Sequence, residues 1–320
     1  MDGDLITAVL ENYNSGTKIL SLAFDEQTLV NLFNQGLNIL CIETNCVLIL
    51  PEKICYPISY ELSEELHRFH NFDVVGINPL GEISMLYDTT SFDNTLLITN
   101  HCNSNCLMCP VSTYVRREDR GVEDSALLEL VKHIPNNSNH ITITGGEPFL
   151  KKDTMLNVLE LIKNNSNNVD CLLLTNGRVF SNLEYFNKFR SVCPANILIG
   201  IPLHGCTALK HDKITQTPGS FDQTVIGIKR LISCGIKVEI RVVISKLNCY
   251  DIEKIAQYIV SEFKKVYSVK FVGLEMMGNA SVNSNDVWIS YTEAFSKSRK
   301  SIDLLVENSI DVELYNFPLC

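Results

Sequence analysis

The chain has 320 residues, of which 45% are hydrophobic and 20% charged, and its formal net charge is −10. This is enough apolar material for one large domain, or for a large domain with an appendage. The negative net charge argues against a surface that binds the phosphates of nucleic acids, although it leaves open an RNA bound by a local basic patch. No apolar run is long enough to span a membrane, and the start M-D-G-D-L-I does not resemble a signal peptide. We therefore expect a cytoplasmic protein with neither nucleic-acid nor membrane partners.

Residues 1–90 predict a small α+β appendage, because short apolar runs and helical patterns are mixed there without regular alternation. The expected helices lie at 26–35 and 63–70, and the expected strands at 37–41, 46–50, 74–77 and 85–87.

Residues 91–310 predict a core domain in which strands and helices alternate, the pattern of a parallel α/β fold. The expected strands are 95–99, 140–144, 169–175, 196–203, 237–245 and 269–275, with helices near 123–133, 153–165, 181–190, 219–234, 251–264 and 290–308. Six units are too few for a closed eight-unit barrel. They favour an open, partial (β/α)6 TIM-like barrel over a doubly wound sheet, although periodicity alone does not separate the two. A seventh apolar stretch, 312–314, follows the last helix.

Twelve cysteines are many for a chain without an export signal, which points to metals, catalysis or core packing rather than disulfides. Cys102, Cys106 and Cys109 stand in T-N-H-C-N-S-N-C-L-M-C-P, directly after the first core strand. Three thiolates at this spacing can hold three irons of a four-iron cluster and leave the fourth iron open to a substrate or cofactor. The open corner predicts an enzyme. Buried packing is the favoured interpretation for seven others: Cys41, Cys46, Cys55, Cys171, Cys193, Cys234 and Cys249.

Polar or glycine residues follow each of the other core strands, where α/β folds place their sites. Gly145-Gly146-Glu147-Pro148 ends the second strand, Asn176 the third and His204 the fourth, while Arg241 lies in the fifth and Glu275 ends the sixth. The glycine pair permits close approach of a ligand to the backbone, so that carbonyl oxygens could bind an ammonium group. An ordinary strand-to-helix turn is the alternative for this segment, and the cysteine triplet beside it favours the functional interpretation.

The cysteine triplet after the first strand, with G-G-E-P after the second, resembles the radical S-adenosylmethionine (SAM) superfamily. The resemblance implies that Cys102, Cys106 and Cys109 ligate a [4Fe–4S] cluster whose open iron chelates SAM. One electron, from a reductant such as a flavodoxin or ferredoxin, then cleaves SAM to a 5′-deoxyadenosyl radical that abstracts hydrogen from substrate. Gly145, Gly146 and Glu147 would hold the methionine ammonium of SAM. Met108 departs from the aromatic residue that the family usually has there.

Further segments are similar to a branch of the family that modifies peptides, and most closely to the maturase of the His-Xaa-Ser peptide system. They are C-L-M-C-P, residues 204–231, V-E-I-R-V-V-I at 238–244, G-L-E-M-M-G-N-A at 273–280 and Y-N-F-P-L-C at 315–320. The resemblance implies a ribosomally made peptide as substrate. Members of that group continue into further cysteines for an auxiliary cluster, whereas residues 311–320 give only the start of a C-terminal extension. Either the sequence is cut short at Cys320 or the auxiliary cluster is absent.

Five other residues are weaker candidates for this site. Arg241, which shares a strand face with Glu239, is expected to bind the carboxylate or ribose of SAM, with a structural ion pair as the alternative. Asn176 and Glu275 could reach the same ligand or serve only in their turns. His204 is a candidate proton donor or substrate contact, or else a core histidine. Cys206 could donate hydrogen near a radical.

Two alternatives to a peptide-modifying enzyme remain at this point. One keeps the radical chemistry and changes the substrate to a nucleoside, a sugar or RNA. The other is a non-catalytic module in which the triplet, with His101 or another side chain, binds zinc. Zinc ligands usually come in separated pairs, and a zinc module explains neither G-G-E-P nor the six strand–helix units.

Overall fold

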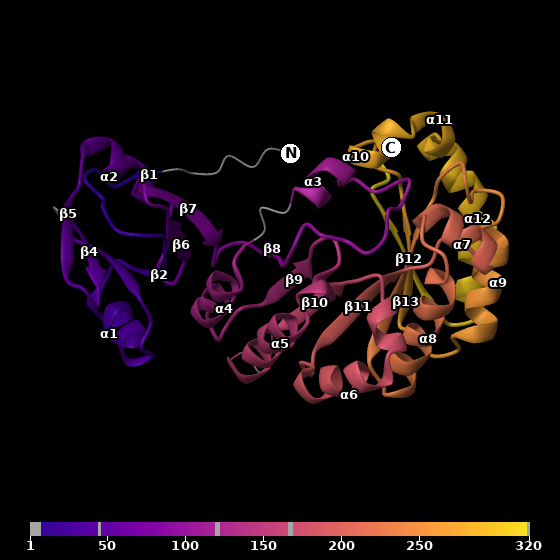
Figure 1. The fold of residues 1–320 in the computed structure, drawn as a ribbon, viewed down its shortest axis with the longest axis horizontal. Helices are drawn as coiled ribbons and strands as arrows, with labels where there is room; N and C mark the ends of the chain where they lie inside the picture. Colours follow the sequence, from indigo (N-terminus) through magenta and orange to yellow (C-terminus); the bar gives the residue numbers. More distant parts are fainter. Residues whose placement is uncertain (1–7, 44–45, 119–121, 166–168, 319–320) are drawn as a thin grey trace. The chain divides into compact units, whose positions relative to one another are not determined.

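The computed structural model describes residues 8–43, 46–118, 122–165 and 169–318, which form two compact units (Figure 1). The first unit comprises residues 1–94, 123–141 and 157–169, and the second comprises residues 95–122, 142–156 and 170–320. Each unit is built on one seven-stranded sheet.

The sheet of the first unit has the strand order β1-β7-β6-β2-β3-β4-β5, and the pair β2–β3 is parallel among antiparallel neighbours. Its elements are β1 (Ala8–Val9), β2 (Lys18–Ala23), α1 (Glu26–Asn34), β3 (Ile39–Ile42), β4 (Cys46–Leu50), β5 (Ile54–Pro57), α2 (Tyr60–Leu66), β6 (Val74–Ile77), β7 (Glu82–Tyr87) and α4 (Asp124–His133).

Apolar side chains pack on both faces of this sheet. On β2, Leu20 and Leu22 join a buried cluster with Leu62 of α2, whereas Ala23 joins a second cluster with Leu32 of α1. Alternate residues of a strand point to opposite faces, so this division follows directly from the sequence order. The expected helix at 63–70 was placed wrongly: it begins at Tyr60 because the Ser59 side chain accepts from the Leu62 N–H. Strands β2 and β5 were not predicted.

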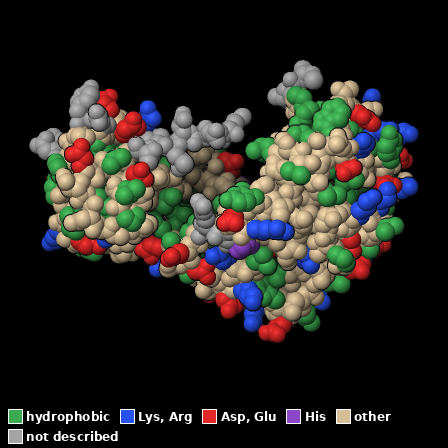
Figure 2. All heavy atoms as spheres, turned by 45° about the horizontal axis from the view of Figure 1, so that its top comes forward, with side chains coloured by type: hydrophobic (Ala, Val, Ile, Leu, Met, Phe, Trp, Pro, Cys, Tyr) green, Lys and Arg blue, Asp and Glu red, His purple; other side chains and the backbone are tan. Residues whose placement is uncertain are grey.

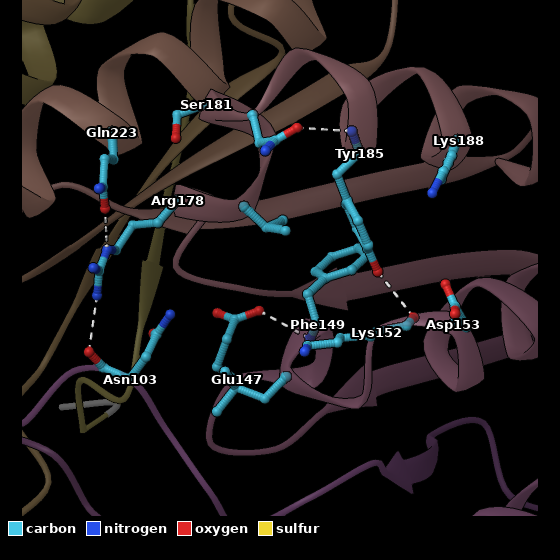
Figure 3. Close-up of a pocket in the computed structure, with 13 residues that line it drawn as sticks. Asn103, Glu147, Phe149, Lys152, Asp153, Arg178, Ser181, Tyr185, Lys188 and Gln223 are labelled. Atoms are coloured by element: carbon cyan, nitrogen blue, oxygen red, sulfur yellow. Dashed lines mark hydrogen bonds between the residues drawn. The ribbon is translucent and has the colours of Figure 1, made fainter.

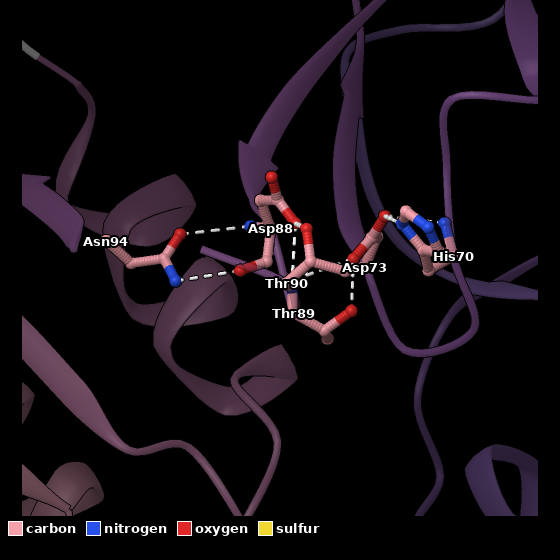
Figure 4. A network of polar contacts seen from close by, with 6 residues as sticks. All are labelled: His70, Asp73, Asp88, Thr89, Thr90 and Asn94. Carbon is pink, nitrogen blue, oxygen red and sulfur yellow. Dashed lines mark hydrogen bonds and ion pairs between the residues drawn. The ribbon is translucent and has the colours of Figure 1, made fainter. Parts of the chain in front are cut away.

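His70, Asp73 and Asp88 form the one group of three potential metal ligands, among the described residues, whose ligand atoms lie within 4.8 Å of one another. The carboxylates of Asp73 and Asp88 accept hydrogen bonds from neighbouring residues (Figure 4). Asp73 is buried and accepts from the His70 N–H at 2.7 Å and from Thr89 N–H at 2.8 Å, while Asp88 accepts from Thr90 N–H at 2.7 Å. This network shapes the turn that follows β7.

The second unit carries the core sheet, in the order β14-β13-β12-β11-β10-β9-β8, and the pairs from β10 to β14 are parallel. Its strands are β8 (Asn94–Leu97), β9 (His140–Thr144), β10 (Asp170–Leu174), β11 (Ile197–Pro202), β12 (Lys237–Val243), β13 (Ser268–Val272) and β14 (Asp311–Tyr315). The sheet is curled into a half-barrel (Figure 1). The predicted α/β class and the partial barrel are confirmed, and each of the seven apolar stretches overlaps a strand. Strand β13, however, ends at Val272, so Glu275 does not end it as predicted.

Helices lie along one face of this sheet (Figure 1). The predicted helices after β9 are α5 (Asp153–Asn165), α6 (Leu183–Val192), α8 (Ser220–Ser233), α9 (Ile252–Glu262) and α12 (Tyr291–Glu307), and the helix predicted near 123–133 is α4 of the first unit. The sequence did not predict the short elements after the strands, which are α3 (Thr113–Arg117), α7 (Ala208–Thr215), α10 (Gly278–Val282), α11 (Ser284–Val287) and the 3₁₀ helices at Pro148–Lys151 and Arg178–Ser181. Val238, Ile240 and Val242 of β12 are fully buried, and the alternate residues Glu239 and Arg241 face the other way.

The interpretation of seven cysteines as core residues holds for three of them. Cys41, Cys171 and Cys249 are buried, Cys46 and Cys193 are half-buried, and Cys55 and Cys234 are exposed. The last two were interpreted wrongly, because Cys55 lies on the edge strand β5 and Cys234 follows the end of α8.

Acidic and basic side chains are interspersed on the face of the molecule in view in Figure 2. Among the described residues, no helix combines the length and the apolar character needed to cross a bilayer.

Candidate functional site

Cys102, Cys106 and Cys109 lie in the loop that follows β8, and all three are half-buried. The loop is fixed by backbone hydrogen bonds to the end of α7. Asn105 N–H donates to the Thr215 carbonyl and Leu107 N–H to the Ile214 carbonyl, each at 3.0 Å. The loop that carries the cysteines is therefore tied to a helix more than one hundred residues away in the chain.

The three thiols are close enough to influence one another electrostatically. Burial, followed by Cys109 and Cys102, raises the pKa of Cys106 to about 12, and burial also raises the pKa of Cys102. The Cys102 and Cys106 thiols are therefore protonated at neutral pH, and a metal that bound them would have to displace these protons.

Helix α10 closes over the other side of the cysteine loop. Asn279 donates through its backbone N–H to the Cys109 carbonyl at 2.9 Å and through Nδ2 to the Cys106 carbonyl at 3.3 Å. A Cβ on Gly278 would lie 2.2 Å from the Pro110 carbonyl oxygen, so only glycine allows this approach. The loop is thus held from two sides, by α7 and by α10.

Met108, which stands where the family usually has an aromatic residue, is buried. It belongs to an apolar cluster with Ile214 of α7, Leu274 and Ala280 of α10. This residue packs the loop against both of its supports.

The glycine pair lies directly against the cysteine loop. Gly146 N–H donates to the Thr99 carbonyl and Glu147 N–H to the His101 carbonyl, each at 2.7 Å. A Cβ on Gly145 would lie 2.4 Å from the Thr99 oxygen, and one on Gly146 would lie 2.2 Å from the His101 oxygen. Glycine is therefore required here by the close approach of the protein's own backbone, which brings the G-G-E-P segment beside the cysteines.

Glu147 is buried, and its side chain is satisfied within the protein. Oε1 accepts from Phe149 N–H at 3.1 Å and from Thr175 Oγ1 at 2.8 Å, and Oε2 accepts from Asn176 N–H at 2.8 Å. Burial raises the pKa of this carboxyl above its ordinary value, against the effect of these donors. Glu147 ties the segment after β9 to the segment after β10.

A cavity of about 500 Å³ adjoins Glu147, and Figure 3 shows its lining. Arg178 crosses one side of it, donating from Nε to Gln223 at 2.7 Å and from Nη1 to the Asn103 carbonyl at 2.9 Å. The Asn176 amide donates to Asn103 Oδ1 at 2.7 Å. Asn176, which the sequence predicted for the site, is therefore hydrogen-bonded to the residue that follows Cys102 in the cysteine loop.

Arg241 and Glu239 form the ion pair that the sequence left as an alternative, with Nη1 and Oε1 3.4 Å apart. The buried Glu239 carboxylate also pairs with Lys270 at 3.1 Å, and Lys270 pairs with Glu313 at 2.9 Å. The Arg241 guanidinium carbon lies 5.6 Å from the centre of the Tyr315 ring. Strands β12, β13 and β14 thus share one charged network, while a contact of Arg241 with SAM stays a prediction.

His204, at the end of β11, is buried and lies against a second buried histidine, His211. The two rings are stacked with their centres 5.7 Å apart, and His204 N–H donates to His211 Nδ1 at 3.2 Å. Burial, followed by His211, lowers the pKa of His204 to about 3, and burial lowers that of His211 to about 4. His204 is therefore neutral at pH 7, so it offers an N–H or a lone pair rather than an imidazolium.

The buried His204–His211 pair leads to a prediction about how the stability of the fold depends on pH. A histidine whose pKa is lower in the folded state binds its proton more readily when the chain is unfolded, so the free energy of unfolding is highest above pH 6.5 and falls as pH decreases towards 4. His211→Gln should reduce the loss of unfolding free energy between pH 6.5 and pH 4 by on the order of 3 kcal/mol. The free energy of unfolding, measured in urea between pH 4 and 7, should depend less steeply on pH in His211→Gln than in the wild type. Equal slopes for His211→Gln and the wild type would contradict the assignment.

The two remaining predicted residues, Cys206 and Glu275, lie in the segments that follow β11 and β13. Cys206 is half-buried between β11 and α7, and Glu275 is exposed and accepts from the Asn316 amide. Sequence reasoning missed Arg116, Arg178 and Asn279. The only signal for Asn279 was its place in the segment 273–280, and nothing in the sequence separates Arg116 from the arginine that follows it.

Comparison with known proteins places this geometry in a family. The model of the Radical SAM superfamily matches residues 96–259, slightly more than half of the chain. A GTP 3′,8-cyclase of Alkaliphilus metalliredigens is 28% identical over 231 residues, covering 69% of this chain and 68% of the relative. The antilisterial bacteriocin subtilosin biosynthesis protein AlbA of Bacillus subtilis is 24% identical over 234 residues, covering 67% of this chain and 50% of AlbA.

Among solved structures, SuiB of Streptococcus suis bound to the precursor peptide SuiA aligns with a TM-score of 0.57 at 13% identity. The alignment covers 71% of this chain and 49% of SuiB, so the chain spans about half the length of SuiB, as it does of AlbA. This likeness concerns the fold. Because the family model covers more than half of the sequence, and because the cysteine loop and G-G-E-P lie side by side, the chain belongs to the radical SAM superfamily, whose members use a [4Fe–4S] cluster and S-adenosylmethionine.

Proposed function

We propose that the protein is a radical SAM enzyme that modifies a ribosomally synthesised peptide, with Cys102, Cys106 and Cys109 as ligands of the [4Fe–4S] cluster. The observation that carries the proposal is the arrangement of the cysteine loop. Three thiols in one loop are supported by two separate helices, and the G-G-E-P backbone is hydrogen-bonded to the same loop. A loop fixed in this way can present three sulfurs to a cluster and keep the fourth coordination position for a ligand.

The SAM site is proposed beside this loop, at Gly145, Gly146 and Glu147. Because the Glu147 carboxylate is engaged with three internal donors, we assign the methionine ammonium to backbone carbonyl oxygens of this segment and give the side chain a positioning role. When bound, the cluster and SAM supply a radical that abstracts hydrogen from the substrate.

Further contacts to SAM are assigned to residues on neighbouring strands. Arg241 has guanidinium donors beyond its single 3.4 Å contact with Glu239, and we assign them to the carboxylate or ribose of SAM. Asn176 and Glu275 are proposed as additional contacts to the same ligand. The hydrogen bond from Asn176 to Asn103 of the cysteine loop supports this assignment.

His204 and Cys206 are proposed on the substrate side of the site. The neutral His204 imidazole is suited to a hydrogen bond with the substrate rather than to donating a proton as an acid. The Cys206 thiol could return a hydrogen atom to a substrate radical.

Two kinds of observation support a peptide as the substrate. The segments that resemble the His-Xaa-Ser system maturase include Ile214, Thr215 and Asn279, which hold the cysteine loop in place. AlbA is named for the biosynthesis of a bacteriocin, and SuiB was solved with a precursor peptide. A flavodoxin or ferredoxin is proposed as the electron donor.

The proposal is tested with anaerobically reconstituted protein, dithionite, SAM and a synthetic peptide that contains His-Xaa-Ser repeats. We expect 5′-deoxyadenosine to be released faster with the peptide than without it, and the mass of the peptide to change. A peptide of the same composition in scrambled order is the control. Release of 5′-deoxyadenosine that neither peptide increases, with no change in peptide mass, would refute the peptide assignment while leaving the radical chemistry in place.

A nucleotide substrate is the second candidate, favoured by the GTP 3′,8-cyclase of A. metalliredigens. The same assay with GTP in place of the peptide separates the two. If GTP increases release of 5′-deoxyadenosine and is itself consumed, while the peptide does neither, then the nucleotide assignment replaces the peptide assignment.

A further inference from the structure

Arg116, in the short helix α3 that follows the cysteine loop, is a buried arginine whose side-chain hydrogen-bond partners among the described residues are all neutral. Its residue is 7% exposed. Nη1 donates to the Ser104 carbonyl at 2.7 Å, and Nη2 donates to Asn105 Oδ1 at 2.6 Å and to Thr113 Oγ1 at 3.3 Å. Nε has no hydrogen-bond partner among the described residues.

A guanidinium in this position requires a negative charge nearby. Removing an arginine from water without a counter-charge costs several kcal/mol, and neutral hydrogen-bond acceptors offset only part of that cost. Arginine does not lose its proton in proteins, so the charge must be balanced rather than discarded. Every acceptor that the structure gives to Arg116 within its described part is neutral.

The cysteines of the loop that Arg116 contacts can become anionic. The guanidinium of Arg116 donates to the loop segment between Cys102 and Cys106. Its side chain also lines the same cavity as Cys102, a hollow of about 420 Å³. Two of its acceptors, Ser104 and Asn105, lie between these two cysteines in the loop.

We propose that Arg116 is the built-in counter-charge of the cysteine triplet and that it makes the cluster held there easier to reduce. The inference rests on the proposed assignment of Cys102, Cys106 and Cys109 as cluster ligands. Reduction transfers one electron from the donor to the cluster and breaks no bond, so the site becomes more negative by one unit. A fixed cation in a poorly solvated position stabilises that extra charge and raises the reduction potential.

The planar guanidinium also orders the loop, so the test must separate charge from hydrogen bonding. Arg116→Gln removes the charge and keeps a polar side chain. Arg116→Lys keeps the charge and loses the fork that bonds Ser104 and Asn105. Arg117→Gln is the matched control for a solvent-screened charge, because Arg117 is the next residue in the same helix and lines the same cavity but is exposed.

The measurement is a potentiometric titration of the reconstituted cluster with dithionite, without SAM, followed by electron paramagnetic resonance. At a fixed potential we expect the ratio of reduced to oxidised cluster to fall about tenfold in Arg116→Gln, which for one electron is ~59 mV. Arg116→Lys and Arg117→Gln should remain close to the wild type. If Arg116→Gln loses the cluster and Arg116→Lys keeps it, the requirement for charge is also supported.

Iron content, measured first, distinguishes this inference from the proposed function on which it rests. A wild-type protein that binds no iron would overturn both. About four irons per chain with an unchanged potential in Arg116→Gln would overturn the role of Arg116 alone. A shift in Arg116→Lys as large as that in Arg116→Gln would also overturn it, because hydrogen bonding rather than charge would then account for the effect.

Discussion

Replacing Cys106 with alanine is expected to abolish cluster binding and SAM cleavage while leaving the protein folded. The substitution removes one of three sulfurs, and the two that remain cannot hold a four-iron cluster that leaves one iron open. Most contacts that fix the loop are made by backbone atoms, including the Cys106 carbonyl, and alanine retains them. Iron content should fall at least tenfold and release of 5′-deoxyadenosine should be lost, with unfolding still cooperative by circular dichroism.

Cys171→Ala is the matched control for this experiment. Cys171 is buried in β10, and burial raises the pKa of its thiol to about 12, the same value as for Cys106. The two thiols therefore differ in position rather than in acidity. Cys171→Ala should cost about 1 kcal/mol of stability and retain iron and SAM cleavage. Full iron content in Cys106→Ala, or equal losses in the two variants, would contradict the assignment of the ligands.

Gly146→Ala is expected to displace the cysteine loop and to reduce cluster binding without altering any ligand. The added Cβ would lie 2.2 Å from the His101 oxygen and 2.6 Å from the Asn100 oxygen, and both are backbone atoms that cannot rotate away. Overpacking of this kind costs about 1–3 kcal/mol. The change should also disturb the 2.7 Å hydrogen bond from Gly146 N–H to Thr99, which holds the two segments together. We expect a lower urea midpoint and fewer than four irons per chain.

Gly16→Ala is the control for this second prediction, because an added Cβ there meets nothing within 4 Å. Its stability should remain within about 0.5 kcal/mol of the wild type, with full iron content. A Gly146→Ala protein with wild-type stability and four irons would show that the close approach of the two segments is not needed for the cluster.

Most of the core sheet could be predicted from the sequence because its strands are apolar and separated by long helical patterns. Strand β9 matches its prediction residue for residue, and β12 begins at the predicted Lys237. The first unit was harder to predict, because β2 and β5 are short apolar runs without such spacing. The start of α2 was misplaced because a single serine cap, Ser59, fixed it rather than the apolar period.

The candidate site was predictable where its residues form a local motif and unpredictable where they act from a distance. The triplet spacing and G-G-E-P are each contained within a few residues, so the sequence alone could place them. Arg116 and Asn279 act through tertiary contacts that no local pattern records. The role of Glu147 was only partly foreseen, since its three hydrogen-bond donors come from segments after two different strands.

The most direct test of the central claim is electron paramagnetic resonance of the anaerobically reconstituted, reduced protein before and after addition of SAM. If three thiolates hold the cluster and one iron is open, the protein should contain about four irons per chain, and SAM should change the spectrum of the reduced cluster. Bound zinc in place of iron, or an iron–sulfur spectrum that SAM leaves unchanged, would contradict the account.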